Sequence, residues 1–168
     1  MTLKAQSAHP PRRSLDRLWI VVADGGVARI LAISDERDHL RVLREHHSPD
    51  AHLKTHELVD APVGRSFESA SSTRHGIASR LDPHAEQKHH FIAGLAEALN
   101  QDSDADLFDQ LVLIVTPAQS HLLLAGLNPR AAAKVLDSIH KDLTKELPQA
   151  IWERLIAAKL MPPRRPAA

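Results

Sequence analysis

Apolar residues near the start of the chain fall into short runs separated by turn residues. Residues 18–23 form one unbroken apolar run, an Asp-Gly-Gly turn follows it, and residues 27–33 resume the apolar pattern. An Asp-Gly pair between two apolar runs is typical of a β-hairpin. After a polar turn, a third run extends from Leu40 to about His46. The pattern therefore predicts an antiparallel meander of three strands.

The second half of the chain alternates between helical and strand patterns. Asp82 followed by Pro83 is typical of a helix start, and apolar residues then recur at helical spacing to about Gln101. Residues 111–115 form a short apolar run, as expected for a strand buried on both faces. The remaining pattern predicts short helices over 118–125 and 129–134, a last strand over 135–143 and a last helix over 148–160.

The order of these elements defines a fold class. Strands that follow crossover helices join a sheet in parallel, whereas the first three strands are antiparallel. The sequence therefore predicts an α/β protein with a ribonuclease-H-like mixed sheet of about five strands and helices on both faces. We expect one domain over residues 15–160, with flexible tails rich in proline and charge over 1–14 and 161–168.

Composition narrows the functional classes. Lys plus Arg and Asp plus Glu both number 21, so a site for a polyanion has to be a local patch. The chain has no cysteine, which excludes disulfides, thiolate metal sites and cysteine nucleophiles. It has no phosphate-binding or dinucleotide glycine motif, so we expect no cofactor. Without a secretory signal or an apolar run of roughly 18 residues, we expect a cytoplasmic protein that does not bind a membrane.

The segment from Ser48 to Arg80 has little periodicity, and a stretch of this length is typically a functional or a disordered loop. Its guanidinium, imidazole and hydroxyl groups can bind phosphate, and its aromatic ring can stack on a base. The candidate nucleic-acid-binding residues are Arg65, Ser66, Phe67, Arg74, His75 and Arg80. The alternative is a solvated loop that Phe67 anchors to the core.

Two sets of residues are candidates for metal chemistry. Asp24 ends the first predicted strand, where ribonuclease-H-like nucleases place a metal-binding carboxylate. The fourth strand supplies no second carboxylate, and Glu86 and Asp142 are no more than possible partners. The simpler interpretation is that Asp24 begins an Asp-Gly turn. His52 and His56 have the spacing of zinc ligands, but their segment lacks a helical pattern and no third ligand is specified, which favours surface histidines.

Strand and loop residues together resemble one known family. They are Trp19-Ile20-Val21-Val22-Ala23-Asp24, Ala28-Arg29, Gly64-Arg65-Ser66-Phe67, Arg74-His75, Asp82-Pro83, Phe108-Asp109, Leu111-Val112-Leu113 and His140-Lys141-Asp142-Leu143-Thr144. With them the chain resembles, from about Trp19 to Leu155, the bacterial family labelled "protein required for attachment to host cells". That family is similar in architecture to the central domain of archaeo-eukaryotic release factors and of Pelota.

The resemblance to release factors implies a role for the loop over residues 62–80, because the equivalent loop of those proteins carries Gly-Gly-Gln. This chain has no Gly-Gly-Gln there, and the next glutamine is Gln87 on the predicted helix. We therefore expect a non-enzymatic protein that associates with RNA or the ribosome and acts indirectly in attachment to host cells. The alternatives are a metal-dependent phosphodiesterase or nuclease that uses Asp24, and a regulatory protein-interaction module. The sequence leaves the oligomeric state open.

Overall fold

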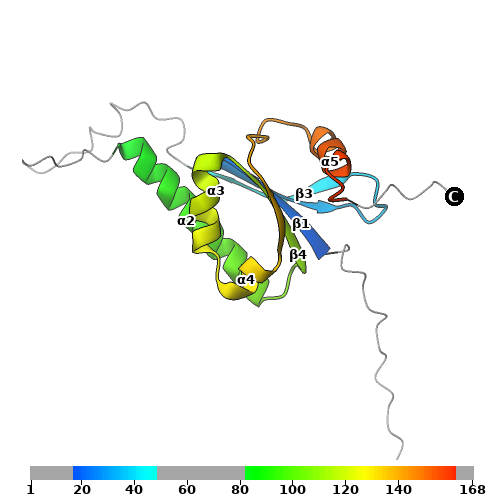
Figure 1. The fold of residues 1–168 in the computed structure, drawn as a ribbon, viewed down its shortest axis with the longest axis horizontal. Coiled ribbons are helices and arrows are strands. Elements are labelled where there is room, and N and C mark those ends of the chain that lie inside the picture. The colour runs from blue at the N-terminus through cyan, green and yellow to red at the C-terminus, as the bar shows by residue number, and fades with distance from the viewer. Residues whose placement is uncertain (1–16, 49–81, 162–168) are drawn as a thin grey trace, which may run out of the picture.

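The computed structural model describes residues 17–48 and 82–161. Within these ranges the chain forms one mixed sheet between two layers of helices (Figure 1). The elements are β1 Leu18–Ala23, β2 Val27–Ile33, β3 Leu40–His47, α2 Pro83–Asp104, β4 Gln110–Val115, α3 Pro117–Gly126, α4 Pro129–Ala133, β5 Val135–Ile139 and α5 Pro148–Ala157. In this part of the chain, no helix is both long enough and apolar enough to cross a membrane.

The strands of the sheet lie in the order β3-β2-β1-β4-β5. The pairs β1 with β2 and β2 with β3 are antiparallel, while β1 with β4 and β4 with β5 are parallel. In the central parallel pair Ala23 lies opposite Val115, so these two strands end side by side. The predicted ribonuclease-H-like arrangement of three antiparallel strands followed by two parallel ones is confirmed.

Two hydrophobic clusters divide the core between the faces of the sheet. The helices α2, α3 and α4 cover one face and α5 covers the other (Figure 1). Successive side chains of β1 alternate between the clusters, because neighbouring residues on a strand point to opposite faces. Trp19 packs on Phe108 beneath α2, with ring centroids 5.0 Å apart, whereas Leu18 joins Trp152 beneath α5. Burial on both faces explains why β1 and β4 are unbroken apolar runs.

Several boundaries differ from the sequence-based expectations. The last strand ends at Ile139 rather than at residue 143, because Leu143 packs beneath α5 instead of continuing the sheet. The last helix ends at Ala157, because Lys159 takes a left-handed backbone conformation with φ of 60° and the Leu160 N–H group turns back to donate to the helix. In contrast to these two elements, α2 is longer than predicted, because it continues to Asp104, three residues beyond the predicted end.

Met161 is the last described residue, and its side chain is buried in the cluster beneath α5. The expected domain over residues 15–160 and the expected tails stay predictions, because most of the tail residues lie outside the described ranges.

Candidate functional site

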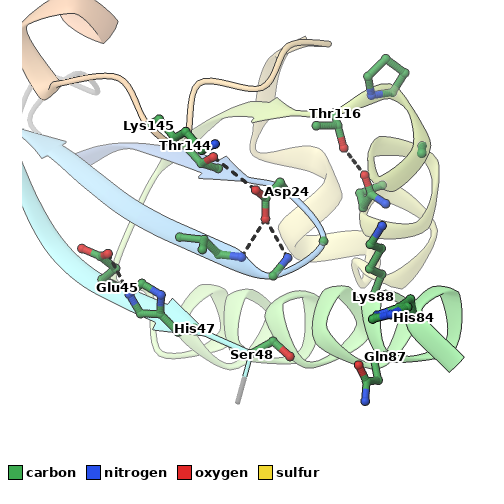
Figure 2. Close-up of a pocket in the computed structure, with 16 residues that line it drawn as sticks. Asp24, Glu45, His47, Ser48, His84, Gln87, Lys88, Thr116, Thr144 and Lys145 are labelled. Carbon is green, nitrogen blue, oxygen red and sulfur yellow. Dashed lines mark hydrogen bonds and ion pairs between the residues drawn. The ribbon is translucent and has the colours of Figure 1, made fainter. Parts of the chain in front are cut away.

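A cavity of about 810 Å³ lies where β1 and β4 end side by side. Asp24 and Thr116, the residues that follow these strands, both line it (Figure 2). The start of α2, the first turn of α3 and the loop after β5 supply further walls. In open α/β sheets, ligands bind in the crevice outside the carboxyl ends of the strands. This strand-end cavity therefore occupies the position where such a fold receives a ligand.

The Asp24 carboxylate is held by the hairpin turn between β1 and β2. Its Oδ1 atom accepts hydrogen bonds from the backbone N–H groups of Gly26 and Val27, at 2.7 and 2.8 Å. The Asp24 N–H group donates to the Val27 carbonyl at 3.0 Å, which closes the turn. Its second oxygen, Oδ2, accepts a hydrogen bond from the Thr144 hydroxyl at 3.3 Å (Figure 2). Asp24 thus has the geometry of an Asp-Gly turn residue, and both of its oxygens have partners.

Asp142 is tied to Thr144 rather than to a shared cation site with Asp24. The Thr144 hydroxyl and N–H group lie 2.7 and 3.0 Å from Asp142 Oδ1, and these two hydrogen bonds lower the pKa of Asp142 below its ordinary value, the hydroxyl having the larger effect. Because a hydroxyl has one proton, Thr144 divides its donation between Asp142 and Asp24.

Glu86, the other possible partner of Asp24, lies on α2 with its carboxylate 3.8 Å from His90 Nε2. Two-metal chemistry needs several carboxylates that converge on one point. Within residues 17–48 and 82–161, the one group of three acidic or histidine side chains close enough to share a cation consists of Glu36, Asp38 and His39. These exposed residues lie between β2 and β3, at the opposite end of the hairpin from Asp24.

Two lysines line the strand-end cavity together with the carboxylates of Asp24 and Glu45. Lys88 reaches it from α2 and Lys145 from the loop after β5, on different sides of the Asp24 turn (Figure 2). In the described part of the chain neither ammonium group forms a close ion pair, although the Lys145 charge adds to the Thr144 hydrogen bonds in lowering the pKa of Asp142. The other acidic side chain of the cavity, Glu45, has a close partner, because its Oε1 atom lies 2.8 Å from His47 Nε2. An anionic ligand would supply the missing partners of the two ammonium groups.

Gly25 determines where the side chain of Lys88 lies. A Cβ atom at Gly25 would be 2.4 Å from Lys88 Cγ and 2.7 Å from Lys88 Cδ, which is too close for non-bonded carbon atoms. The absence of a side chain at this position therefore lets the aliphatic part of Lys88 lie directly against the turn. In the Asp-Gly-Gly sequence, the aspartate closes the turn and the first glycine makes room for a cation from another element.

Arg29 holds the loop that carries Lys145. From β2, its Nη2 atom donates hydrogen bonds to the backbone carbonyl oxygens of Leu143 and Glu146, at 3.0 and 2.7 Å. The Glu146 side chain also lies 3.6 Å from the guanidinium of Arg154 on α5. Lys145 is therefore placed by a loop whose backbone is attached to the sheet on both sides of it.

The structure brings together only part of what the sequence singled out. Asp24 lies in the wall of the cavity, while the remaining candidates lie outside the described residues. Those are the nucleic-acid-binding candidates Arg65, Ser66, Phe67, Arg74, His75 and Arg80 and the zinc candidates His52 and His56. The described residues at either end of that segment, Ser48 and His84, both line the cavity.

Sequence reasoning missed Lys88 and Lys145. The one signal that could have located them is topological, because residues near the carboxyl ends of adjacent parallel strands meet at the same edge of the sheet. The strand pairing of β1 with β4 and the loop that follows β5 place both lysines at that edge. Neither lysine belongs to a local motif, so the spacing of residues along the chain does not mark them.

The fold and its cavity define an α/β protein with a ribonuclease-H-like mixed sheet that can receive a ligand at its strand ends. The chain belongs to the family described as "Protein required for attachment to host cells", whose model matches residues 19–155. The family membership expected from the sequence is thereby confirmed. No curated protein matches the chain.

Similar solved structures include one described as an archaeal protein, with 13% sequence identity and a TM-score of 0.47. Another is the archaeal translation termination factor aRF1, with 12% identity and a TM-score of 0.44. The matches cover 88% and 87% of this chain but 35% and 39% of the other two chains. This chain therefore spans well under half the length of either structure.

Proposed function

We propose that this host-attachment-family protein is a non-enzymatic cytoplasmic factor that associates with RNA or the ribosome and influences attachment to host cells indirectly. The observation that carries the proposal is the pair of cavity lysines, Lys88 and Lys145, neither of which forms a close ion pair within the described residues. Phosphate groups bind ammonium, hydroxyl and backbone N–H groups, all of which are present in this cavity. An RNA backbone is an extended row of such phosphates.

The composition of residues 62–80 supports the same ligand. Within residues 62–80, three arginines are accompanied by the single acidic residue Glu68, although the chain as a whole has a formal net charge of zero. Ser48 and His84, described residues near the two ends of the segment 49–81, line the same cavity as the two lysines. In sequence, residues 62–80 thus concentrate cations within an otherwise neutral chain, as polyanion binding requires.

Removal of the cavity lysines should weaken RNA binding in steps. Lys88→Gln and Lys145→Gln each remove one cation, and each lost phosphate contact should lower the slope of log affinity against log salt by about 0.7 for a single strand. The double variant should show the sum of both changes. Fluorescence anisotropy of a labelled single-stranded RNA at several salt concentrations measures these slopes. The matched control is Lys141→Gln, an exposed lysine near the same loop that does not line the cavity.

Equal affinities and salt slopes in the double variant and in Lys141→Gln would show that RNA does not bind in the cavity. A variant with Arg65→Ala and Arg74→Ala then tests whether RNA binds through the arginine-bearing segment instead. If the unaltered protein binds no RNA at low salt and does not co-sediment with ribosomes, the proposal fails and the protein-interaction module becomes the better hypothesis.

We expect no enzyme-like cleavage of RNA in the presence of magnesium or manganese. Among the described residues no group of acidic side chains that could share a cation includes Asp24, and its carboxylate oxygens already accept hydrogen bonds within the protein. Gel analysis of a labelled RNA incubated with the purified protein and metal tests this expectation. Metal-dependent cleavage that disappears in Asp24→Asn would contradict it and favour the nuclease hypothesis.

A further inference from the structure

A smaller pocket adjoins the strand-end cavity. It has a volume of about 250 Å³ and lies between the end of β3 and one side of α2. His47 lines both spaces, so they meet at this side chain. We call the smaller space the β3–α2 pocket. A ligand that extends past His47 would contact both spaces.

The walls of the β3–α2 pocket suit a flat heteroaromatic ring. The Phe91 ring and the imidazoles of His46, His47 and His90 line it together with apolar residues of α2. Phenylalanine and histidine rings are among the side chains on which proteins stack the splayed bases of single-stranded RNA. Gly94 adds no side chain to the pocket, and a Cβ atom at this position would have no heavy atom within 4 Å. The pocket is therefore open above Gly94.

The spacing along α2 connects the pocket with the cation of the cavity. Lys88, Phe91 and Leu95 follow one another at intervals of three and four residues, so they lie on the same side of the helix. The two residues therefore lie about one helical turn apart along α2. In a nucleotide the phosphate and the base are joined through one sugar. A protein that binds both therefore needs a cation and an aromatic ring close to each other.

We propose that the β3–α2 pocket binds one unstacked base of a single-stranded RNA whose phosphates lie in the strand-end cavity. This inference rests on the proposed RNA binding and adds to it the site that contacts a base. The strand passes His47, with a phosphate at Lys88 and the base against Phe91. An acidic peptide would satisfy the lysines, but it would supply no planar ring with hydrogen-bonding edges for the pocket.

Filling the pocket separates base binding from phosphate binding. Gly94→Leu places a branched side chain in the open space above the helix, and leucine is also the better helix former. We expect the affinity for single-stranded RNA to fall about fivefold or more, which is the effect of losing one stacked base. The affinity for an abasic strand of the same length and charge should stay unchanged. Gly94→Ala, which adds only one methyl group, is the matched control and should bind RNA as the unaltered protein does.

Phe91→Leu is the second test variant, because it removes the ring but keeps an apolar side chain against the core. It too should weaken binding of RNA and leave binding of the abasic strand unchanged, with thermal unfolding checked for every variant. Equal affinity of the unaltered protein for both strands would overturn the base pocket while leaving the proposed function in place. Unchanged RNA binding in both Gly94→Leu and Phe91→Leu would also overturn the base pocket alone. Absence of binding to either strand would overturn both the base pocket and the proposed function. If Gly94→Leu weakened the binding of an acidic peptide but not of RNA, the pocket would be reassigned to a protein partner.

Discussion

Replacement of Trp152 by alanine should lower the free energy of unfolding by about 3–5 kcal/mol, as expected when a fully buried aromatic side chain leaves a cavity. Trp152 is 1% exposed and belongs to the cluster that α5 forms with one face of the sheet. Within the described residues α5 is the one helix on this face, so no neighbouring helix can move in to fill the space. Urea unfolding followed by circular dichroism measures the change as a shift of the midpoint at constant slope.

Two variants control this prediction. Ile156→Ala removes a side chain of the same helix that is 38% exposed and should cost much less. Trp152→Phe keeps a large ring and loses no hydrogen bond, because Trp152 Nε1 has no partner among the described residues. A midpoint for Trp152→Ala equal to that of Ile156→Ala would show that α5 does not close this face of the core.

Arg29→Met should affect both stability and the proposed binding. The guanidinium donates to two loop carbonyl groups, and hydrogen bonds from charged groups contribute about 1.5–3 kcal/mol. Methionine retains an unbranched apolar side chain, so the change isolates the loss of the donors. Because the same loop places Lys145, the variant should also weaken RNA binding about as much as Lys145→Gln. Urea unfolding and anisotropy titrations measure the two effects on one preparation.

Arg154→Met is the matched control for Arg29→Met. The Arg154 side chain is 47% exposed and pairs with the Glu146 side chain, whereas Arg29 bonds to the Glu146 backbone. Exposed ion pairs contribute little to stability, so Arg154→Met should unfold close to the unaltered protein. Coincident unfolding curves for the two variants would mean that the Arg29 bonds do not hold the loop, and the placement of Lys145 would need another explanation.

Local signals predicted most of the fold because burial and pattern agree in its central elements. The runs that became β1 and β4 are apolar at nearly every position, which is the pattern of strands covered on both faces. The start of α2 followed from Asp82 and Pro83, and in the structure the Asp82 carboxylate accepts a hydrogen bond from the His84 N–H group at 3.1 Å. The predicted end of β5 was wrong. The sequence pattern around an apolar residue such as Leu143 does not distinguish a residue that continues a strand from one that packs beneath a helix.

The candidate site could be predicted less well, because its parts come from distant segments. Asp24 was visible from its turn motif, but a motif cannot tell whether a carboxylate will bind a metal or its own backbone. The contact between Gly25 and Lys88 is tertiary, and the sequence around either residue does not predict it. The positions of Lys88 and Lys145 depend on strand order and on a loop held by Arg29, which local patterns do not specify.

The close approach of Gly25 and Lys88 also restricts how this sequence can evolve. A side chain at position 25 would need the space that the Lys88 methylene groups occupy, so the two positions cannot drift independently. A lineage that enlarges residue 25 must shorten or redirect the side chain of residue 88, which changes where its cation lies. A substitution in a surface turn, conservative by its own chemistry, would thus alter the charge presented by a helix encoded some sixty codons later.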